Sequence, residues 1–181
     1  MPLRDADLNA WVPNPQVCTR HRREAAAGPD ALWSAARTVR LSDTGTIGRM
    51  VRWRIPGVAV DQSFGGLLSE EPFIVLDEGE RWSISGLVGR IWTLARDYPR
   101  LDGADAFRTW SEPRAVRVLM AHWVEQISDG RSAIVSESRI APTDRVAAAR
   151  LGALWLALGP FERLIGAEPL TLAVKRAESP A

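Results

Sequence analysis

The chain of 181 residues contains a single cysteine, Cys18, and only two histidines, His21 and His122. One cysteine excludes a disulfide within the chain and a metal site built from several cysteines, so a reducing, cytoplasmic compartment is expected. Two histidines without a neighbouring cluster of acidic residues give little support to a zinc or iron site. We therefore expect no metal and no other cofactor.

The chain also lacks an excess of charge of either sign. Its 23 Lys and Arg residues almost balance its 22 Asp and Glu residues, which leaves a formal net charge of +1. This balance provides no overall electrostatic field that would attract a polyanion or an anionic membrane. Nucleic acid is therefore not an expected partner.

Long apolar runs are absent as well. The longest apolar run, residues 151–158, is far shorter than the roughly 20 residues that a membrane-spanning helix needs. Residues 1–11 include acidic side chains and no apolar stretch of signal-peptide length. The sequence predicts a soluble, cytoplasmic protein with no membrane span.

The chain does contain enough apolar material for one core. Of its residues 46% are hydrophobic and 25% are charged, and eight tryptophans are spread from Trp11 to Trp155. This length and composition suit one globular domain. We predict an irregular leader over residues 1–15, a single domain over residues 16–178 and a frayed tail over residues 179–181.

The domain is predicted to begin with a strand and two short helices. Residues 16–27 alternate loosely in polarity, as in an edge strand. A helix can begin at Pro29, and its apolar residues recur at helical spacing up to Val39. Residues 46–53 suit a second helical piece, which Pro56 ends.

Antiparallel strands are predicted for the middle of the chain. Short apolar or alternating runs, separated by glycine, proline and acidic turns, cover residues 64–68, 73–76 and 81–85. Two longer strands, residues 114–127 and 131–141, flank Asp129-Gly130. This pair favours a type I′ hairpin because both residues tolerate a positive φ.

A long helix is predicted to close the chain. Thr143 or Asp144 can cap its N-terminus, and one face carries the apolar residues Ala147, Leu151, Leu154, Trp155 and Leu158. Pro160 should interrupt or kink this helix, which resumes in segments that include Leu164 and Val174. Because the stripe is too apolar for water and follows several strands, the helix must lie against the sheet. The sequence therefore predicts an α+β fold around one core or cavity.

The order strand, helix, helix, several strands and long helix resembles the helix-grip, or START-like, superfamily (SRPBCC). Local features that resemble a bacterial branch of it, within residues 16–178, are Arg22-Arg23-Glu24, Pro29-Asp30-Ala31-Leu32-Trp33, Gly89-Arg90-Ile91-Trp92, Phe107 with Trp110, Glu137-Ser138-Arg139, Thr143-Asp144, and Trp155 ahead of Gly159-Pro160-Phe161. The chain departs from the commonest pattern at Trp110, where phenylalanine is frequent, and at Pro113-Arg114, where a proline-glycine turn is frequent.

The resemblance implies a helix-grip fold, in which a curved antiparallel sheet wraps around the long C-terminal helix and two short helices follow the first strand. Members of the superfamily bind lipids, sterols, polyketides or plant hormones in a cavity between sheet and helix, and some cyclise polyketides. The resemblance therefore implies a cavity, without identifying its ligand.

One pair of residues suggests acid/base chemistry. Counting outward from Asp129-Gly130 places His122 opposite Glu137, with Arg139 two residues along on the same face. A carboxylate beside an imidazole favours the charged imidazole, and Arg139 competes for that carboxylate. His122 and Glu137 are thus the candidate catalytic pair. In the alternative interpretation all three side chains decorate a solvent face, because the opposite face is the more apolar one, bearing Leu119, Ala121, Trp123, Ile127, Ile134 and Ile140.

The tryptophans are the remaining candidates, since they either line an apolar pocket or fill a dry core. We predict a ligand-binding set of Trp82, Trp92, Trp123, Glu137, Arg139, Leu154 and Trp155. The predicted function is binding of a small, mainly apolar molecule such as a lipid, polyketide or aromatic metabolite. One alternative is a cyclase-like or dehydratase-like enzyme that uses His122 and Glu137. The other is a ligand-free scaffold or stress protein, which acts through its surface or as a homodimer.

Overall fold

The structure is a computed structural model that describes residues 3–54, 57–93, 95 and 97–179. Within helices, it does not describe the side chains of residues 5, 6, 54 and 160–166.

Five antiparallel strands form one open sheet, in the order β1-β5-β4-β3-β2. The strands are β1 (Val17–Ala25), β2 (Ile74–Gly79), β3 (Trp82–Gly89), β4 (Val116–Ser128) and β5 (Arg131–Pro142). Strands β2 to β5 follow one another as a meander, and β1 pairs with β5. The first and last strands of the chain are therefore neighbours, which leaves β1 and β2 as the two edges of the sheet.

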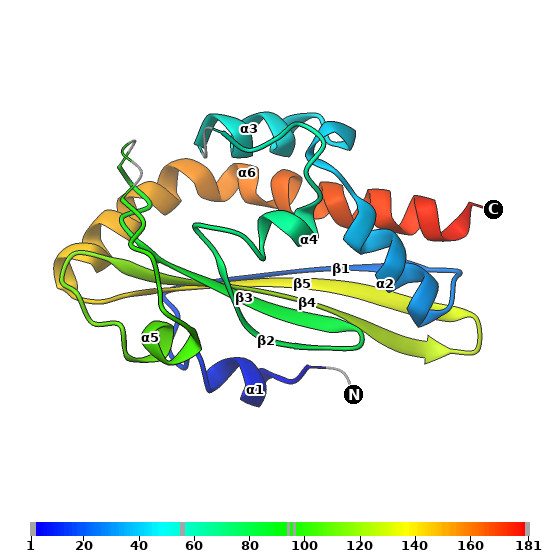
Figure 1. Cartoon of the computed structure of the whole chain (residues 1–181), viewed down its shortest axis with the longest axis horizontal. Coiled ribbons are helices and arrows are strands. Elements are labelled where there is room, and N and C mark those ends of the chain that lie inside the picture. Colours follow the sequence, from blue (N-terminus) through cyan, green and yellow to red (C-terminus); the bar gives the residue numbers. More distant parts are fainter. Residues whose placement is uncertain (1–2, 55–56, 94, 96, 180–181) are drawn as a thin grey trace.

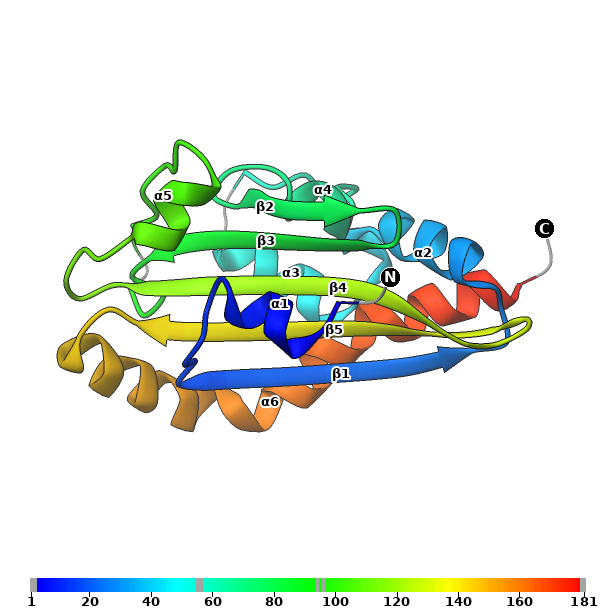
Figure 2. The same cartoon turned by 90° about the horizontal axis from the view of Figure 1, so that it is seen from below.

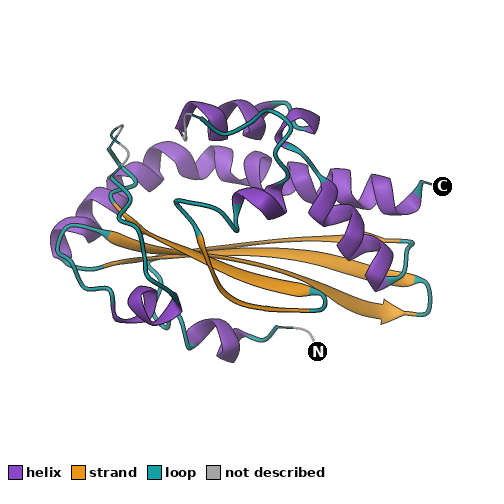
Figure 3. Cartoon of the chain, in the orientation of Figure 1, coloured by secondary structure: helices purple, strands orange, loops and turns teal. Residues whose placement is uncertain are grey.

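Helices cover both faces of this sheet (Figures 1 and 3). They are α1 (Asp5–Asn9), α2 (Pro29–Thr38), the 3₁₀ turn η1 (Leu41–Asp43), α3 (Thr46–Arg54), α4 (Phe64–Leu67), α5 (Ala104–Thr109) and α6 (Arg145–Glu178). In the view of Figure 1, α2, α3, α4 and α6 lie above the sheet, on what we call its upper face. Helices α1 and α5 lie below it, on the lower face, as Figure 2 also shows.

Each face of the sheet carries its own core. The lower-face cluster includes Leu8, Trp11, Val12, Ile84, Phe107, Leu119, Ala121, Trp123 and Val135. The upper face has two separate clusters, one of Val17, Leu87, Val116, Val118, Ile140 and Leu151, and one of Ala25, Ala27, Leu32, Val124, Ile134 and Leu170. A sheet that is buried on both sides explains why the apolar contrast between its two faces is weak in the sequence.

The C-terminal helix confirms the predicted fold class, an α+β domain in which a long helix packs on an antiparallel sheet. Asp144 caps α6, and its Oδ1 accepts a hydrogen bond from the Ala147 amide at 2.7 Å. The helix then packs on β1, β5 and α2. Buried Leu151 and Leu170 hold its two halves on the two upper clusters.

The predicted interruption at Pro160 is wrong. Helix α6 continues from Arg145 to Glu178, with Pro160 and Pro169 inside it. Proline removes one backbone hydrogen bond and disfavours a helix interior, but packing of the helix on the sheet at both ends outweighs that local cost. The side chain of Leu164, predicted to lie on the resumed helix, is outside the described residues.

The strand predicted over residues 64–68 does not form, because Phe64–Leu67 is the helix α4 and Leu68 is its C-cap. Ser63 caps α4, since its Oγ accepts a hydrogen bond from the Gly66 amide at 3.0 Å. Gly65 and Gly66 have no side chains with which to stabilise a strand by cross-strand contacts. Local capping therefore determines the structure of this segment.

The N-terminal leader also differs from expectation, because residues 1–15 include the short helix α1. Leu8, Trp11 and Val12 follow helical spacing and are buried in the lower-face cluster. One helical turn is too short for hydrophobic periodicity to reveal it in a sequence.

The predicted hairpin at Asp129-Gly130 forms, with Ser128 paired with Arg131, but its turn is not the predicted type I′, because Gly130 has a positive φ of 70° and Asp129 does not. A β-bulge follows directly, because Gln126 pairs with Ser132 and leaves Ile127 as the extra residue. The bulge shifts the register by one residue, so each residue of β4 before it pairs with the neighbour of the β5 residue that uninterrupted counting from the turn gives, and that neighbour projects from the other face.

The predicted pairing of His122 with Glu137 is therefore wrong. His122 faces Ser136, and Glu137 faces Ala121. His122 lies on the upper face, whereas Glu137 and Arg139 lie on the lower face with Ala121. The predicted solvent face does not exist either: Glu137 and Arg139 are buried, and His122 borders a pocket.

Candidate functional site

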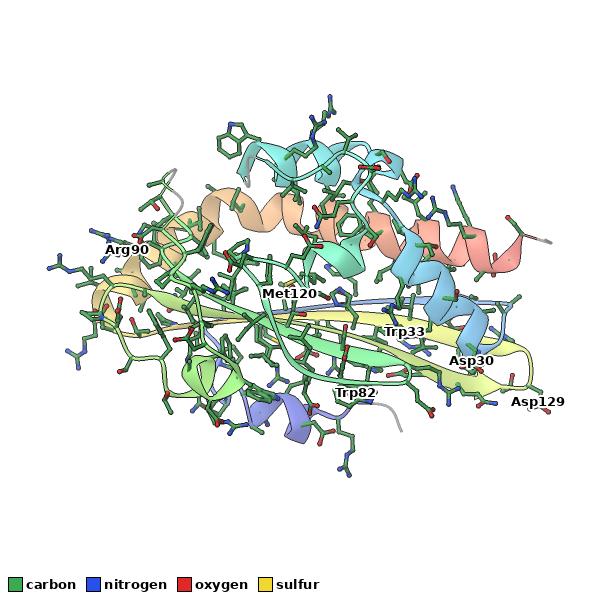
Figure 4. The ribbon with its side chains drawn as sticks, in the orientation of Figure 1. Asp30, Trp33, Trp82, Arg90, Met120 and Asp129 are labelled. Atoms are coloured by element: carbon green, nitrogen blue, oxygen red, sulfur yellow. The ribbon has the colours of Figure 1, made fainter. Side chains whose placement is uncertain are left out.

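A pocket of about 250 Å³ lies between the upper face of the sheet and helices α2, α3 and α4. Strands β3, β4 and β5 form its floor. From the C-terminal helix, only Pro169 and Leu170 reach it among the described residues. The pocket thus lies beside α6, under a roof made mainly by the shorter helices. Figure 4 labels Met120 and Trp33, which come from the floor and from α2, respectively.

The floor of the pocket carries a row of polar side chains. Ser83 on β3 pairs with His122 on β4, which pairs with Ser136 on β5, and Ser136 pairs with His21 on β1. Directly paired residues of antiparallel strands place their Cβ atoms about 4.5–5.5 Å apart. The row therefore crosses the sheet and places both histidines of the chain in one line of paired residues. Three members of the row, Ser83, His122 and Ser136, border the pocket.

His122 is the best-defined polar group of this floor. Its Nε2 lies 3.1 Å from Ser136 Oγ. Burial lowers the pKa of His122 to about 4. The imidazole is therefore neutral near pH 7, with one ring nitrogen that donates a hydrogen bond and one that accepts. Such a group suits an uncharged hydroxyl or carbonyl of a ligand better than an anion.

Apolar side chains supply most of the pocket's walls. They include Trp33 and Ala36 of α2, Ile47 and Val51 of α3, Phe64 and Leu67 of α4, and Phe73 just before β2. Two exposed charged residues, Arg37 and Glu78, also border the pocket. They indicate that the pocket reaches solvent between α2 and the β2 edge of the sheet.

The N-terminus of the roof helix α3 is attached to α6. The carboxylate of Glu168, on α6, accepts hydrogen bonds from the amides of Gly45 at 2.6 Å and Ile47 at 3.3 Å. These are amides that a helix leaves without partners at its start. Arg176 adds an ion pair with Asp43 of η1, at 2.6 Å. Glu168 and Arg176 of α6 thus hold the first turn of α3 and the preceding turn η1 in place.

Three of the predicted ligand-binding residues lie on the face away from the pocket. Trp123 is buried in the lower-face cluster, and its Nε1 donates to Glu125 at 2.9 Å. Glu137 accepts hydrogen bonds from Arg139 Nε and Arg20 Nε, both at 2.5 Å. Arg139 also donates to the Asn9 side chain at 2.5 Å and thereby joins α1 to the sheet. The sulfur of Cys18 also approaches Glu137, at 3.7 Å, and burial raises the pKa of that thiol.

The other predicted residues divide between the pocket and its surroundings. Trp82 borders the pocket and also packs against the lower-face cluster. Trp92 and Trp155 pack around the upper cluster of Val17 and Leu151, with the guanidinium of Arg150 5.9 Å from the Trp92 ring. Leu154 is half-buried on α6 and does not border the pocket.

Several residues that line the pocket were not predicted, chiefly Trp33, Phe64, Phe73, Met120 and Ser136. Trp33 was assigned to the apolar side of its helix, but nothing in that pattern separates a core position from a pocket position. Phe64 was assigned to a strand, and no pattern in the sequence singled out Ser136. Met120 lies two residues before His122 on β4, so the alternation of side chains along this strand puts both on one face of the sheet, and this is the sequence signal that leads to the floor.

Metal-binding and membrane-spanning features are both missing from the part of the chain that the structure describes. It contains no group of three or more His, Cys, Asp or Glu residues that could hold a metal ion. None of the described helices combines the length and apolar character that crossing a membrane requires.

Comparisons with known proteins give structural similarities only. No protein-family model and no curated protein sequence matches the chain. Similar solved structures include the Mll3558 protein of Rhizobium loti, at 12% identity and a TM-score of 0.42, over 88% of this chain and 96% of that one. The hypothetical protein jhp0584 of Helicobacter pylori is 9% identical, with a TM-score of 0.41 and 93% of each chain covered.

The Zhui aromatase/cyclase of a Streptomyces species is 14% identical, with a TM-score of 0.34, over 90% of this chain and 93% of that one. At these identities and TM-scores, the similarities carry no argument about function, which has to come from the site itself.

Proposed function

We propose that this protein binds a small, mainly apolar and uncharged molecule in the pocket between α2, α4 and the sheet. The observation that carries the proposal is the combination of apolar walls with a neutral His122 on the floor. Ligand sites are typically apolar cavities with a few polar groups that orient the ligand. Ser136 and Ser83, on either side of His122, add hydroxyls that donate or accept.

The dimensions of the pocket limit the size of the ligand. A volume of about 250 Å³ is just below the roughly 300–1,000 Å³ of pockets that hold drug-sized molecules. A molecule of one to three rings, or a short acyl chain, is the size that suits it. Burial of such a ligand contributes roughly 25 cal/mol for each Å² of apolar surface that leaves water.

The arrangement of one antiparallel sheet, two early helices and a long C-terminal helix supports membership of the helix-grip superfamily as part of the same proposal. An enzyme that uses His122 with Glu137 is not part of it, because those side chains project from opposite faces of the sheet. A proton transfer in the pocket would have to use His122 with Ser136, which lie 3.1 Å apart.

A pair of matched ligands tests the proposal. Naphthol is uncharged near pH 7, whereas naphthoate has the same rings and a carboxylate. We expect naphthol to raise the melting temperature and to be retained in native mass spectra, and naphthoate to have little effect. Ala36→Trp, which fills the pocket from α2, should abolish the response to naphthol. Ala31→Trp, at an exposed position of the same helix, should leave it unchanged.

Two results would contradict the proposal. One is the absence of binding by naphthol and by a panel of uncharged aromatic alcohols, ketones and short-chain acyl alcohols. The other is equal binding by the Ala36→Trp and Ala31→Trp variants, which would place the ligand outside this pocket.

A further inference from the structure

The outer sides of α3 and α6 expose large apolar side chains to water. Trp53 on α3 is 69% exposed and Leu156 on α6 is 85% exposed, and Met50 and Val146 are also exposed. Helix α3 lies on the outer side of α6, away from the sheet (Figure 1), and the two helices are in contact. Large apolar side chains that are exposed on adjacent elements of a folded chain indicate an interaction surface.

The stretches of α3 and α6 that carry these residues contain positive charge and no negative charge. Residues 46–54 and 145–159 include five arginines and no Asp or Glu, although the whole chain is nearly balanced. We define the basic apolar surface as Arg49, Met50, Arg52 and Trp53 on α3 with Arg145, Val146, Arg150 and Leu156 on α6. All eight side chains are exposed. None of its arginines forms an ion pair with another residue that the structure describes.

One of these arginines is unfavourable for the helix that carries it. Arg145 is the first residue of α6. A cation at a helix N-terminus lies next to the positive end of the helix dipole, where an acidic residue is the stabilising choice. Its position is therefore not explained by helix stability and fits recognition of a negative partner.

We infer that the basic apolar surface binds anionic lipid bilayers. Tryptophan prefers the interface between water and lipid, and arginine attracts anionic headgroups there. A helix that presents apolar and basic side chains together lies in that interface. A second copy of this chain is a poor partner for the surface, because face-to-face contact would bring the arginines of both copies together without any acidic residue.

The inner side of α3 connects this surface to the pocket. Ile47 and Val51 are four residues apart and line the pocket, whereas Arg49 and Trp53 are also four apart and face outward. Helix α3 would then lie between the bilayer and the pocket. If the proposed function holds, an apolar ligand that partitions into lipid is within reach of the pocket at this point. Binding to lipid itself does not depend on that function.

Co-sedimentation of the full chain with vesicles tests the inference. We expect stronger binding to equimolar phosphatidylcholine and phosphatidylglycerol than to phosphatidylcholine alone, and loss of that difference at high salt. Arg49→Gln and Arg52→Gln should each weaken binding about fivefold. Trp53→Ala should weaken binding to vesicles roughly tenfold, because the variant lacks the apolar side chain that leaves water for the lipid. Matched controls are Arg23→Gln on β1 and Ile127→Ala in the hairpin, which are exposed outside the surface.

Three outcomes would overturn the inference. The first is equal binding to both kinds of vesicle, or no binding to either. The second is weakening by the control variants as large as by Trp53→Ala. The third is a concentration-dependent mass in sedimentation velocity that Trp53→Ala abolishes, which would assign the surface to a second copy of the chain. The naphthol response of Trp53→Ala, measured in parallel, separates failure of lipid binding from failure of the pocket.

Discussion

His122 and Glu137 project from opposite faces of the hairpin formed by β4 and β5. Ile127, the extra residue of the bulge, is the reason, since Ser128 pairs with Arg131 but His122 pairs with Ser136. The imidazole consequently borders the pocket, whereas the carboxylate is buried under α1 in contact with Arg139. The two groups have separate roles that separate measurements can distinguish.

The neutral state of His122 predicts a pH dependence of stability. The pKa of His122 falls from 6.5 to about 4 in the folded protein, so below pH 6.5 the unfolded chain binds a proton that the folded chain does not. The contribution of His122 to the free energy of unfolding is complete above pH 6.5. It is lost as the pH falls toward 4, and the loss is about 3 kcal/mol at most.

Urea denaturation at pH 7 and pH 4.5 checks this expectation. The loss of unfolding free energy on acidification should be smaller in His122→Gln than in the unaltered protein, and it should persist in His21→Gln. The same acid sensitivity in both variants would contradict the assignment to His122.

The buried pair of Glu137 and Arg139 predicts a stability effect without a ligand effect. Glu137→Leu leaves the guanidinium of Arg139 buried without its carboxylate, and we expect a loss of roughly 3–5 kcal/mol in the free energy of unfolding. Adding Arg139→Met should recover a large part of that loss, because the buried charge that lacks a partner is then removed, while Arg20, the other partner of Glu137, is exposed to water.

Denaturation curves of the single and double variants measure this recovery. Because both side chains lie on the lower face, the naphthol response of the double variant should match that of the unaltered protein. A selective loss of that response, with stability restored, would show that the pair reaches the pocket.

Gly48 predicts a steric limit on the roof of the pocket. A Cβ atom at this position would overlap the carbonyl oxygen of Leu41 and lie 2.7 Å from Thr44 Oγ1. Gly48→Ala should force α3 away from η1 and destabilise the protein by about 1–3 kcal/mol. Gly45→Ala is the matched control, since its Cβ would meet Glu168 Oε1 at an ordinary 3.5 Å. Thermal unfolding that ranks the two variants equally would contradict the prediction.

The hydrogen bonds of Glu168 predict that this side chain stabilises α3 locally. Glu168→Ala removes the carboxylate that accepts from Gly45 and Ile47, and loss of a helix cap costs about 1 kcal/mol. We expect faster amide hydrogen exchange over residues 45–54 with little change over β4 and β5. In Glu168→Gln, which keeps an oxygen acceptor, the exchange rate over residues 45–54 should lie between the rates of the unaltered protein and of Glu168→Ala. Uniformly faster exchange throughout the domain would indicate a global effect in place of a local one.

Much of the fold was predictable because local patterns agree with it. The alternation along β1, the apolar spacing in α2 and the Asp129-Gly130 turn each specify their own element, as does the apolar stripe that places α6 against a sheet. Residues 64–68 show where that agreement fails. A short run with Phe64 and Leu67 matches strand and helix equally well, and Ser63 decides between them by capping.

The candidate site was less predictable, because its residues come together only through pairing at long sequence separation. His122 borders the pocket, but the partner predicted for it was wrong, because it pairs with Ser136 and not with Glu137. Trp33 and Phe64 come from segments far from β4 in the sequence, and no local pattern records that they line the same pocket as His122. Trp123 and Arg139 are buried on the lower face, where a second layer of helices replaces the solvent that alternation alone suggests.

By itself the sequence determined which segments are helices and strands over most of the chain, where the hairpin turns and which end carries the long apolar helix, since these depend on neighbours within a few residues. Only the tertiary structure decided which face each side chain occupies and what covers it. The physical reason is the period of two along a strand: one unpaired residue, Ile127, exchanges the two faces of β5 relative to β4, and no local preference encodes that exchange.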